Sequence, residues 1–188
     1  MKILGLVGSL RRDSYNAMLM RAAAELLPSE AELEVFEDLA AIPAFDEDLE
    51  GGPAPAAVTA LKRAIEGADA ILIATPEYNG SIPGFLKNAL DWVSRPFETN
   101  PLRNKPAAVL GASTGMFGAV WAQAELRKVL GLIGARALDR DTPVGLATMR
   151  FDAGGELHDP ESREAIGETL AALVEMVHER EAYLADAA

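Results

Sequence analysis

Apolar residues along this chain follow two patterns, which alternate from one end of the chain to the other. Short runs in which nearly every residue is apolar are typical of strands buried on both faces, whereas apolar residues three or four positions apart are typical of helices that bury one side. Runs of the first kind predict strands at residues 2–7, 70–74 and 107–112. Residues 32–37 largely alternate acidic with apolar side chains, which predicts a half-exposed strand at a sheet edge.

Helical spacing predicts five helices, several of which end at a proline or a glycine. Proline lacks the N–H that a helix interior needs but is accepted in a first turn, and glycine readily ends a helix. The predicted helices are residues 15–27 before Pro28, 57–66 before Gly67, 83–93 with Pro83 in the first turn, a stripe of Ala122, Leu126, Val129, Leu130 and Ile133 before Gly134, and a closing stripe of Ile166, Leu170, Leu173, Val174 and Val177.

We place a fifth strand between the last two helices, somewhere in residues 135–144, where Pro143 blurs its boundary. Five strands that are each followed by a helix indicate a parallel, doubly wound α/β sheet, because parallel strands need crossovers and both sheet faces need cover. The edge-like second strand fits the order 2-1-3-4-5. No repeat or linker divides residues 1–188, so we expect one domain, with the long connection at 38–55 covering a site or an interface.

Composition narrows the classes of function. The net charge of −12 argues against nonspecific binding to nucleic acid or to a membrane surface, because phosphate groups would repel most of the protein. Residues 2–7 are too short for the core of a signal peptide, and no later apolar run reaches membrane-spanning length, so we expect a cytoplasmic protein.

Candidate metal ligands and catalytic thiols are scarce. The chain has no cysteine, which excludes thiol catalysis, disulfides and thiolate metal sites. His158 and His178 are isolated in the sequence and are expected at the surface, so we predict no metal site. Glu161, Glu164 and Glu168 have the spacing of a solvated helix face. Redox chemistry in this protein would therefore need a bound cofactor.

In doubly wound sheets, ligands bind outside the carboxyl ends of the strands, near the reversal between strands 1 and 3. This rule selects three loops, at residues 8–16, 75–84 and 113–118. Convergence of the three loops on one point is a stronger indication of a site than any one loop alone.

The first loop, GSLRRDSYN, places hydrogen-bond donors at the start of a helix. Gly8 permits a tight strand exit, Arg11 supplies a charged donor, and the first helical turn presents unpaired N–H groups. This combination predicts an anion site. The alternative is that Asp13 or Ser14 only caps the helix and that Arg11 and Arg12 are solvated. The neutral donors of the loop are Ser9, Ser14 and Asn16.

The second loop, TPEYNGSIPG, is stiffened by two prolines and loosened by two glycines, and it can present main-chain groups to a flat polar ring. Tyr78 is expected either to lie against such a ring or to be a partly buried packing residue. Glu77 is expected to pin the loop or to make a subunit contact. Asn79 can hydrogen-bond a neighbouring main chain.

The third loop, GASTGMFG, offers the hydroxyls of Ser113 and Thr114 between small residues, and it could border the same ring from the other side. The alternative is a turn in which Ser113 or Thr114 caps the next helix. Three aromatic residues flank the predicted site, and core or subunit packing is expected for them, with a lid over the ligand as the alternative. They are Trp92, Phe117 and Trp121.

The segments GSLRRDSYN, PEYNGSIPGFLKNALDW and GASTGMFGAVWAQAELRKVL resemble the signature segments of the NADPH-dependent FMN reductase family, in the same order and at suitable spacing. This flavodoxin-like group includes quinone, chromate and azo-dye reductases. The resemblance implies a three-layer sandwich around the sheet, FMN as cofactor, NADPH or NADH as hydride donor, a small-molecule electron acceptor, and a homodimer or homotetramer.

The resemblance also implies roles for individual residues. Donors of the first loop would hold the FMN phosphate, the second loop would line the ribityl chain and the isoalloxazine, and the third would touch the ring. Gly80 stands where some relatives carry an aromatic residue, so the resemblance does not say which side chain stacks on the flavin ring. No side chain need act as a nucleophile, because the flavin carries the chemistry. The implied residues are Ser9, Arg11, Ser14, Tyr15 and Asn16 in the first loop, Pro76, Glu77, Tyr78 and Asn79 in the second, and Ser113, Thr114 and Gly115 in the third.

Two other classes of function remain open at the level of sequence. A flavodoxin-type electron carrier would also be acidic and bind FMN, but it would need no nicotinamide site. A regulatory or binding module without flavin is the second alternative.

Overall fold

The computed structural model describes residues 1–186. Its strands and main helices are, in chain order, β1 (Lys2–Val7), α1 (Tyr15–Leu26), β2 (Glu32–Val35), α2 (Ala56–Glu66), β3 (Ala70–Thr75), α3 (Gly84–Val93), β4 (Pro106–Ala112), α4 (Val120–Ile133), β5 (Arg136–Ala137), β6 (Pro143–Val144), α5 (Ala147–Arg150) and α6 (Pro160–Asp186). Short 3-10 helices lie at Asp38–Ala41, Glu47–Leu49 and Phe97–Thr99.

The strands form a parallel sheet in the order β2-β1-β3-β4-β5, which confirms the predicted flavodoxin-like order. The fifth strand is broken into two short pieces, both within the predicted range 135–144. β5 pairs with the start of β4, and β6 pairs with its end at Gly111 and Ala112. The chain between the two pieces leaves the ladder and returns to it, so β4 is paired near both of its ends on this side.

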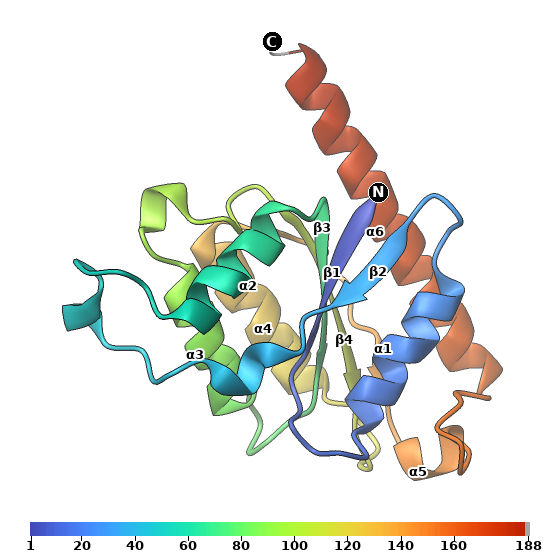
Figure 1. The fold of residues 1–188 in the computed structure, drawn as a ribbon. Helices are drawn as coiled ribbons and strands as arrows, with labels where there is room; N and C mark the ends of the chain where they lie inside the picture. The colour runs from blue at the N-terminus through green and yellow to red at the C-terminus, as the bar shows by residue number, and fades with distance from the viewer. Residues whose placement is uncertain (187–188) are drawn as a thin grey trace.

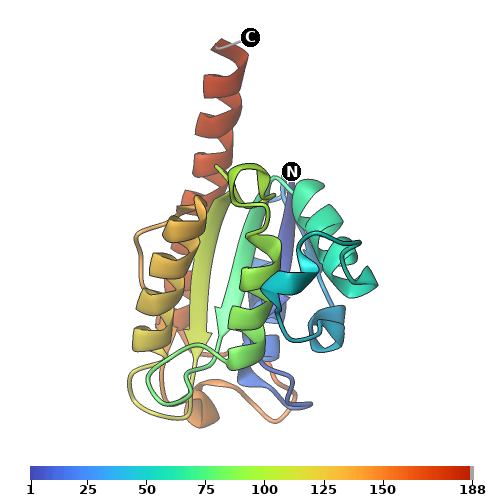
Figure 2. The same ribbon diagram turned by 90° about the vertical axis from the view of Figure 1, so that its left-hand side faces the viewer.

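Helices cover both faces of the sheet, as Figures 1 and 2 show. Helices α2, α3 and α4 lie on one face, and α1 and α6 lie on the other. Successive side chains of β3 point to opposite faces, so Ile71 and Ile73 join one apolar core while Leu72 and Ala74 join the other. This alternation explains why the strand is apolar from Ala70 to Ala74, and it confirms the three-layer arrangement.

The edge strand and the helix ends differ in detail from the predictions. Within β2, Leu33 is half-buried, and Val35 is 39% exposed because β2 lies at the sheet edge. Pro83 is the residue before α3 and not part of its first turn. α6 extends to residue 186, well past its buried stripe, and its last turns project beyond the sheet (Figure 1).

Surface positions on and near α6 agree with the sequence analysis. His158 and His178 are exposed, and so are the three glutamates at 161, 164 and 168. Within residues 1–186, no helix has both the length and the apolar character needed to cross a membrane.

The connection between β2 and α2 is fastened to α3. The carbonyl oxygen of Pro43 accepts hydrogen bonds from Trp92 Nε1 at 2.9 Å and from Asn88 Nδ2 at 2.8 Å. Phe45 meets the Trp92 ring edge to face, with centroids 5.1 Å apart. Trp92 is only 2% exposed and lies near the end of α3 remote from the second loop, so it is a core residue and the lid interpretation is wrong for it.

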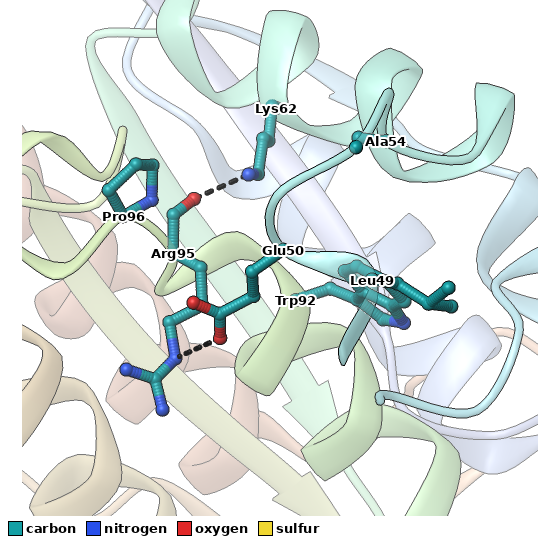
Figure 3. A pocket seen from close by; sticks show the side chains of 8 residues that line it. Leu49, Glu50, Ala54, Lys62, Trp92, Arg95 and Pro96 are labelled. Atoms are coloured by element: carbon teal, nitrogen blue, oxygen red, sulfur yellow. Dashed lines mark hydrogen bonds and ion pairs between the residues drawn. The ribbon is translucent and has the colours of Figure 1, made fainter. Parts of the chain in front are cut away.

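A cavity of about 240 Å³ separates the end of this connection from α2 and the residues after α3 (Figure 3). Its polar groups pair with one another. Lys62 Nζ donates to the carbonyl oxygen of Arg95 at 2.5 Å, and Arg95 Nε lies 3.2 Å from Glu50 Oε1 in an ion pair that lacks hydrogen-bond geometry. Burial lowers the pKa of Lys62. These contacts hold the connection to the body of the protein.

Candidate functional site

The three loops selected from the sequence meet at the carboxyl edge of the sheet, around a cavity of about 450 Å³. Every predicted site residue lines this cavity except Asn79 and Gly115, which lie outside its lining. Ala112 and Thr148 complete the wall. The full lining is Ser9, Arg11, Ser14, Tyr15, Asn16, Pro76, Glu77, Tyr78, Ala112, Ser113, Thr114 and Thr148.

Gly8 lies in close packing at the exit from β1, where a side chain would crowd its neighbours. Its N–H donates to the carbonyl oxygen of Ala74 at 2.7 Å. A Cβ atom at this position would lie 3.0 Å from Leu86 Cδ2 and 3.2 Å from Ala74 O. The absence of a side chain therefore lets the first loop turn directly beside β3 and α3.

Ser14 caps α1, and Asp13 does not. The Oγ atom of Ser14 accepts hydrogen bonds from the N–H groups of Asn16 and Ala17, at 3.2 and 3.3 Å. These bonds use the oxygen lone pairs and leave the hydroxyl hydrogen free to donate. Capping and anion binding are therefore compatible at this residue, and the positive end of the α1 dipole adds to both.

Asn16 is committed to the protein's own backbone. Its Nδ2 donates to the carbonyl oxygen of Ala112 at 3.0 Å, and its Oδ1 accepts from Ala112 N–H at 2.9 Å. The residue is 3% exposed. Its side chain thus joins α1 to the end of β4, and one amide hydrogen remains for a ligand.

Arg11 carries the positive charge at this end of the cavity. Its guanidinium lies 5.5 Å from the centre of the Tyr15 ring, and Tyr15 packs against Phe151 with ring centroids 5.5 Å apart. Among the residues that the structure describes, no carboxylate forms an ion pair with Arg11. Arg12 is exposed and does not line the cavity.

Glu77 pins the second loop to α4. Its Oε2 accepts from the N–H groups of Trp121 and Ala122, at 3.1 and 3.2 Å. The residue before α4, Ala119, has a left-handed backbone with φ 61° and provides no side-chain cap. Glu77 therefore satisfies helix donors that would otherwise lack partners, which confirms the structural interpretation of this residue.

Tyr78 stands at the start of a tight turn. Its N–H and carbonyl oxygen pair with those of Ser81, at 2.9 and 3.1 Å, and the two residues between them have positive φ angles of 55° and 76°. Such angles suit Asn79 and Gly80, the residues found there. The turn leaves Tyr78 53% exposed beside the cavity, and both interpretations of this residue, a ring contact and a packing residue, stay predictions.

The third loop is packed against the chain that follows β6. A Cβ at Gly118, where φ is 57°, would lie 2.6 Å from Val144 N, and one at Gly145 would lie 2.0 Å from Met116 O. The main chain of Ser113 also bonds to Val144 O and Ala147 N. Because α4 begins at Val120, neither Ser113 nor Thr114 caps it, and that alternative is wrong.

The sequence analysis missed Thr148, which comes from α5 and lines the cavity. A signal for it was present in the topology. The carboxyl end of the fifth strand reaches the same sheet edge as β1, β3 and β4, so the rule that selected three loops also selects the segment after Val144.

Phe117 and Trp121 form an exposed pair beside the site. Their rings meet edge to face with centroids 5.0 Å apart, and the residues are 58% and 53% exposed. Neither lines the cavity, and neither is in the core. Core packing is therefore wrong for both, and subunit packing and a lid over the ligand stay the two predictions for this pair.

The donor set fits a flavin mononucleotide. The hydroxyls of Ser9 and Ser14, the guanidinium of Arg11 and the amino end of α1 lie together, where they can bind a phosphate. Tyr78 and main-chain groups of the second and third loops offer a surface for a planar ring. A volume of about 450 Å³ is within the usual range for sites of small ligands and cofactors.

Comparisons with known proteins agree with this geometry. The sequence profile of NADPH-dependent FMN reductases matches residues 1–147. A Pseudomonas aeruginosa protein named NAD(P)H-dependent FMN reductase is 44% identical over 173 residues, 92% of either chain. A 2-hydroxy-1,4-benzoquinone reductase from a Burkholderia species is 39% identical over 165 residues, 87% of this chain and 89% of the relative.

Among solved structures, the flavoenzyme NAD(P)H:(acceptor) oxidoreductase FerB from Paracoccus denitrificans is similar over 95% of this chain and 97% of its own. Its TM-score is 0.83, at 35% identity. The profile match, the identities and the site agree, and we conclude that this chain belongs to the NADPH-dependent FMN reductase family, the NAD(P)H-dependent enzymes that use FMN.

Proposed function

We propose that this protein transfers a hydride from NADPH to bound FMN and then passes electrons to a small acceptor, for which a quinone is the first candidate. The observation that carries the proposal is the meeting of three loops around one open cavity, with anion donors at one end and an exposed tyrosine turn at the other. FMN, when bound, supplies the hydride-accepting and electron-donating chemistry.

The chain's own residues have three tasks in this proposal. Ser9, Arg11 and Ser14 hold the phosphate at the amino end of α1, where dipole, hydroxyls and guanidinium all favour an anion. Tyr78 and the main chain of the second and third loops orient the ring. Glu77 positions the second loop through α4 and does not need to touch the ligand.

A quinone is proposed as acceptor because the cavity is open beside Tyr78 and because the Burkholderia relative is named for a benzoquinone. Chromate, azo dyes and free flavin belong in the same assay, since a small acceptor of any of these classes needs only access to the ring. NADPH is proposed as the donor from the family's description, with NADH to be compared in parallel.

We also propose that the active form is a cytoplasmic homodimer or homotetramer. Apolar side chains on α4 and the loop before it are exposed in the single chain: Met116, Phe117, Trp121 and Leu132 are 71%, 58%, 53% and 67% exposed. Met116, Phe117 and Trp121 lie on the third loop and the first turn of α4, beside the cavity, and they favour a partner surface that borders the site, whereas Leu132 lies at the opposite end of α4.

The test is a visible spectrum of purified protein reconstituted with FMN, followed by anaerobic addition of NADPH and then of benzoquinone. We expect the flavin band to appear bound, to bleach rapidly with NADPH and to return with the quinone. Binding without bleaching would support the flavodoxin-type carrier instead. No binding of FMN would leave the flavin-free module as the better interpretation of the three loops.

A further inference from the structure

A larger cavity lies at the amino-terminal edge of the sheet, remote from the candidate flavin site. Its volume is about 620 Å³. It is lined by Arg103 and Asn104 from the loop before β4, by Arg136 at the start of β5, and by four residues of α6 between positions 179 and 184. This part of α6 is the one that projects beyond the sheet in Figure 1.

Positive charge gathers around this cavity, although the chain as a whole carries −12. Three arginines line it, and the acid in the lining, Glu179, lies 3.5 Å from Arg136 NH2. Within residues 1–186, no carboxylate forms an ion pair with Arg103 or Arg180. Arg103 and Arg180 therefore line the cavity without an acidic partner from the described chain.

A buried lysine that follows Asn104 in the chain is close enough to respond to the charge of Arg180. Lys105 is 5% exposed, and its Nζ donates to the carbonyl oxygen of Ala68 at 2.5 Å. Burial lowers the pKa of Lys105 most, the charge of Arg180 lowers it further, and the charges of Asp69 and Glu66 raise it. Arg180 is thus close enough to repel a second cation, and an anion in the cavity would offset that repulsion.

The remaining lining suits an aromatic group. Tyr183 and Leu184 are 73% and 51% exposed, so an apolar wall faces the space beside the arginines. The guanidinium of Arg103 lies 5.5 Å from the centre of the Phe97 ring, a contact that orients it. A planar guanidinium binds phosphate or carboxylate through paired hydrogen bonds, and a cavity of this volume is of ligand size.

We propose that this cavity binds a small organic dianion that carries an aromatic ring, of the nucleoside monophosphate class. Arg103 and Arg180 bind the anionic group, and Tyr183 lies against the ring. The cavity shares no residue with the flavin site, so the proposal stands apart from the proposed function.

Calorimetric titration with adenosine monophosphate at low salt tests the proposal, using protein saturated with FMN so that the flavin site is occupied. We expect binding that Arg103→Ala and Arg180→Ala each weaken by about tenfold or more. Arg180→Lys keeps the charge but loses the paired donors, and it should also weaken binding. Arg63→Ala is the matched control, since Arg63 is an exposed arginine of α2 outside the cavity.

Ligand controls separate the two parts of the proposed recognition. Adenosine without phosphate should not bind measurably, and inorganic phosphate should bind more weakly than the nucleotide. Phosphate that binds as tightly as the nucleotide would contradict a role for Tyr183. The proposal is overturned if the nucleotide does not bind, or if Arg63→Ala weakens binding as much as the cavity variants do. Binding of polyglutamate in place of the nucleotide would reassign the surface to an acidic macromolecule.

Discussion

At the scale of single residues, the cavity at the carboxyl edge is built by side chains with different tasks. Arg11 faces the cavity with its charge free of ion pairs among the described residues, whereas Asn16 and Glu77 bond to the protein's own backbone. Residues of the first kind are expected to affect ligand affinity directly. Residues of the second kind are expected to act through the position of a loop or strand.

Arg11→Ala should weaken FMN binding by about 1.5–3 kcal/mol, because one charge-assisted contact among several is lost. Fluorescence titration of FMN measures the dissociation constant. Arg12→Ala is the matched control, since Arg12 neighbours Arg11 in the chain but does not line the cavity. An unchanged dissociation constant in Arg11→Ala would remove this residue from the site.

Glu77→Ala should lower the free energy of unfolding by about 1 kcal/mol, the usual cost of losing a helix cap, since Trp121 and Ala122 lose their shared acceptor. It should also weaken FMN binding, because the second loop is released. Glu77→Gln keeps an acceptor oxygen and should recover part of both losses. Urea unfolding and FMN titration of the two variants check this, and a loss of affinity without any loss of stability would argue that Glu77 touches the ligand.

At the scale of elements, the segment between β6 and α6 depends on one well-placed cap. Asp159 Oδ2 accepts from the N–H and the hydroxyl of Ser162, at 2.9 and 2.6 Å, and Pro160 follows as the first helical residue. Arg150 NH1 donates to the same oxygen at 2.6 Å, which joins α5 to α6. Because α5 carries Thr148, this cap also fixes one wall of the candidate site.

Asp159→Ala should lower the free energy of unfolding by about 1 kcal/mol at neutral pH. The hydrogen bond from the Ser162 hydroxyl, followed by that from its N–H and the charge of Arg150, lowers the pKa of Asp159 in the folded protein. Its stabilisation is therefore complete above the unfolded pKa of about 3.9 and is lost as the pH falls through the lower folded value. Urea unfolding at pH 7 and at successively lower pH should show the free energies of unfolding of wild type and variant converging. A difference that stays constant with pH would contradict stabilisation by the ionised Asp159 carboxylate.

At the scale of the whole molecule, a strongly acidic protein exposes an apolar patch next to its candidate site. Net charge of one sign keeps chains apart, so the proposed self-association would need local burial of apolar surface. Met116, Phe117 and Trp121 provide this patch, from the first turn of α4 and the loop before it.

Trp121→Glu should shift the protein toward the monomer in sedimentation velocity, because an added carboxylate would have to be desolvated in an apolar contact. The main-chain N–H of Trp121 still bonds to Glu77 in this variant, so the fold of the loop is preserved. Val35→Glu adds the same charge at an apolar residue that is 39% exposed on β2, at the sheet edge remote from α4, and it should leave the oligomer unchanged. Equal sedimentation of wild type and Trp121→Glu would exclude this patch as the interface.

The sequence by itself determined the strands, the order of the sheet and the three loops that converge, because periodicity and strand burial are local properties. Most predicted site residues line the cavity for the same reason, since strand ends of a parallel sheet must meet at one edge. Tertiary structure alone decided the rest. Asn16 bonds to Ala112, 96 positions away, and Glu77 bonds to an N–H 44 positions away. Contacts between such distant residues produce no pattern in the neighbouring sequence.

The fifth strand is another feature that local sequence patterns do not determine. Its two pieces are too short to have a period of their own, and they exist because β4 offers unpaired backbone groups at both ends. Thr148 reaches the cavity only through that arrangement and the cap at Asp159. Exposure was likewise decided by the assembled chain: Trp92 lies in the core and Trp121 at the surface because only the first meets a connection folded over it.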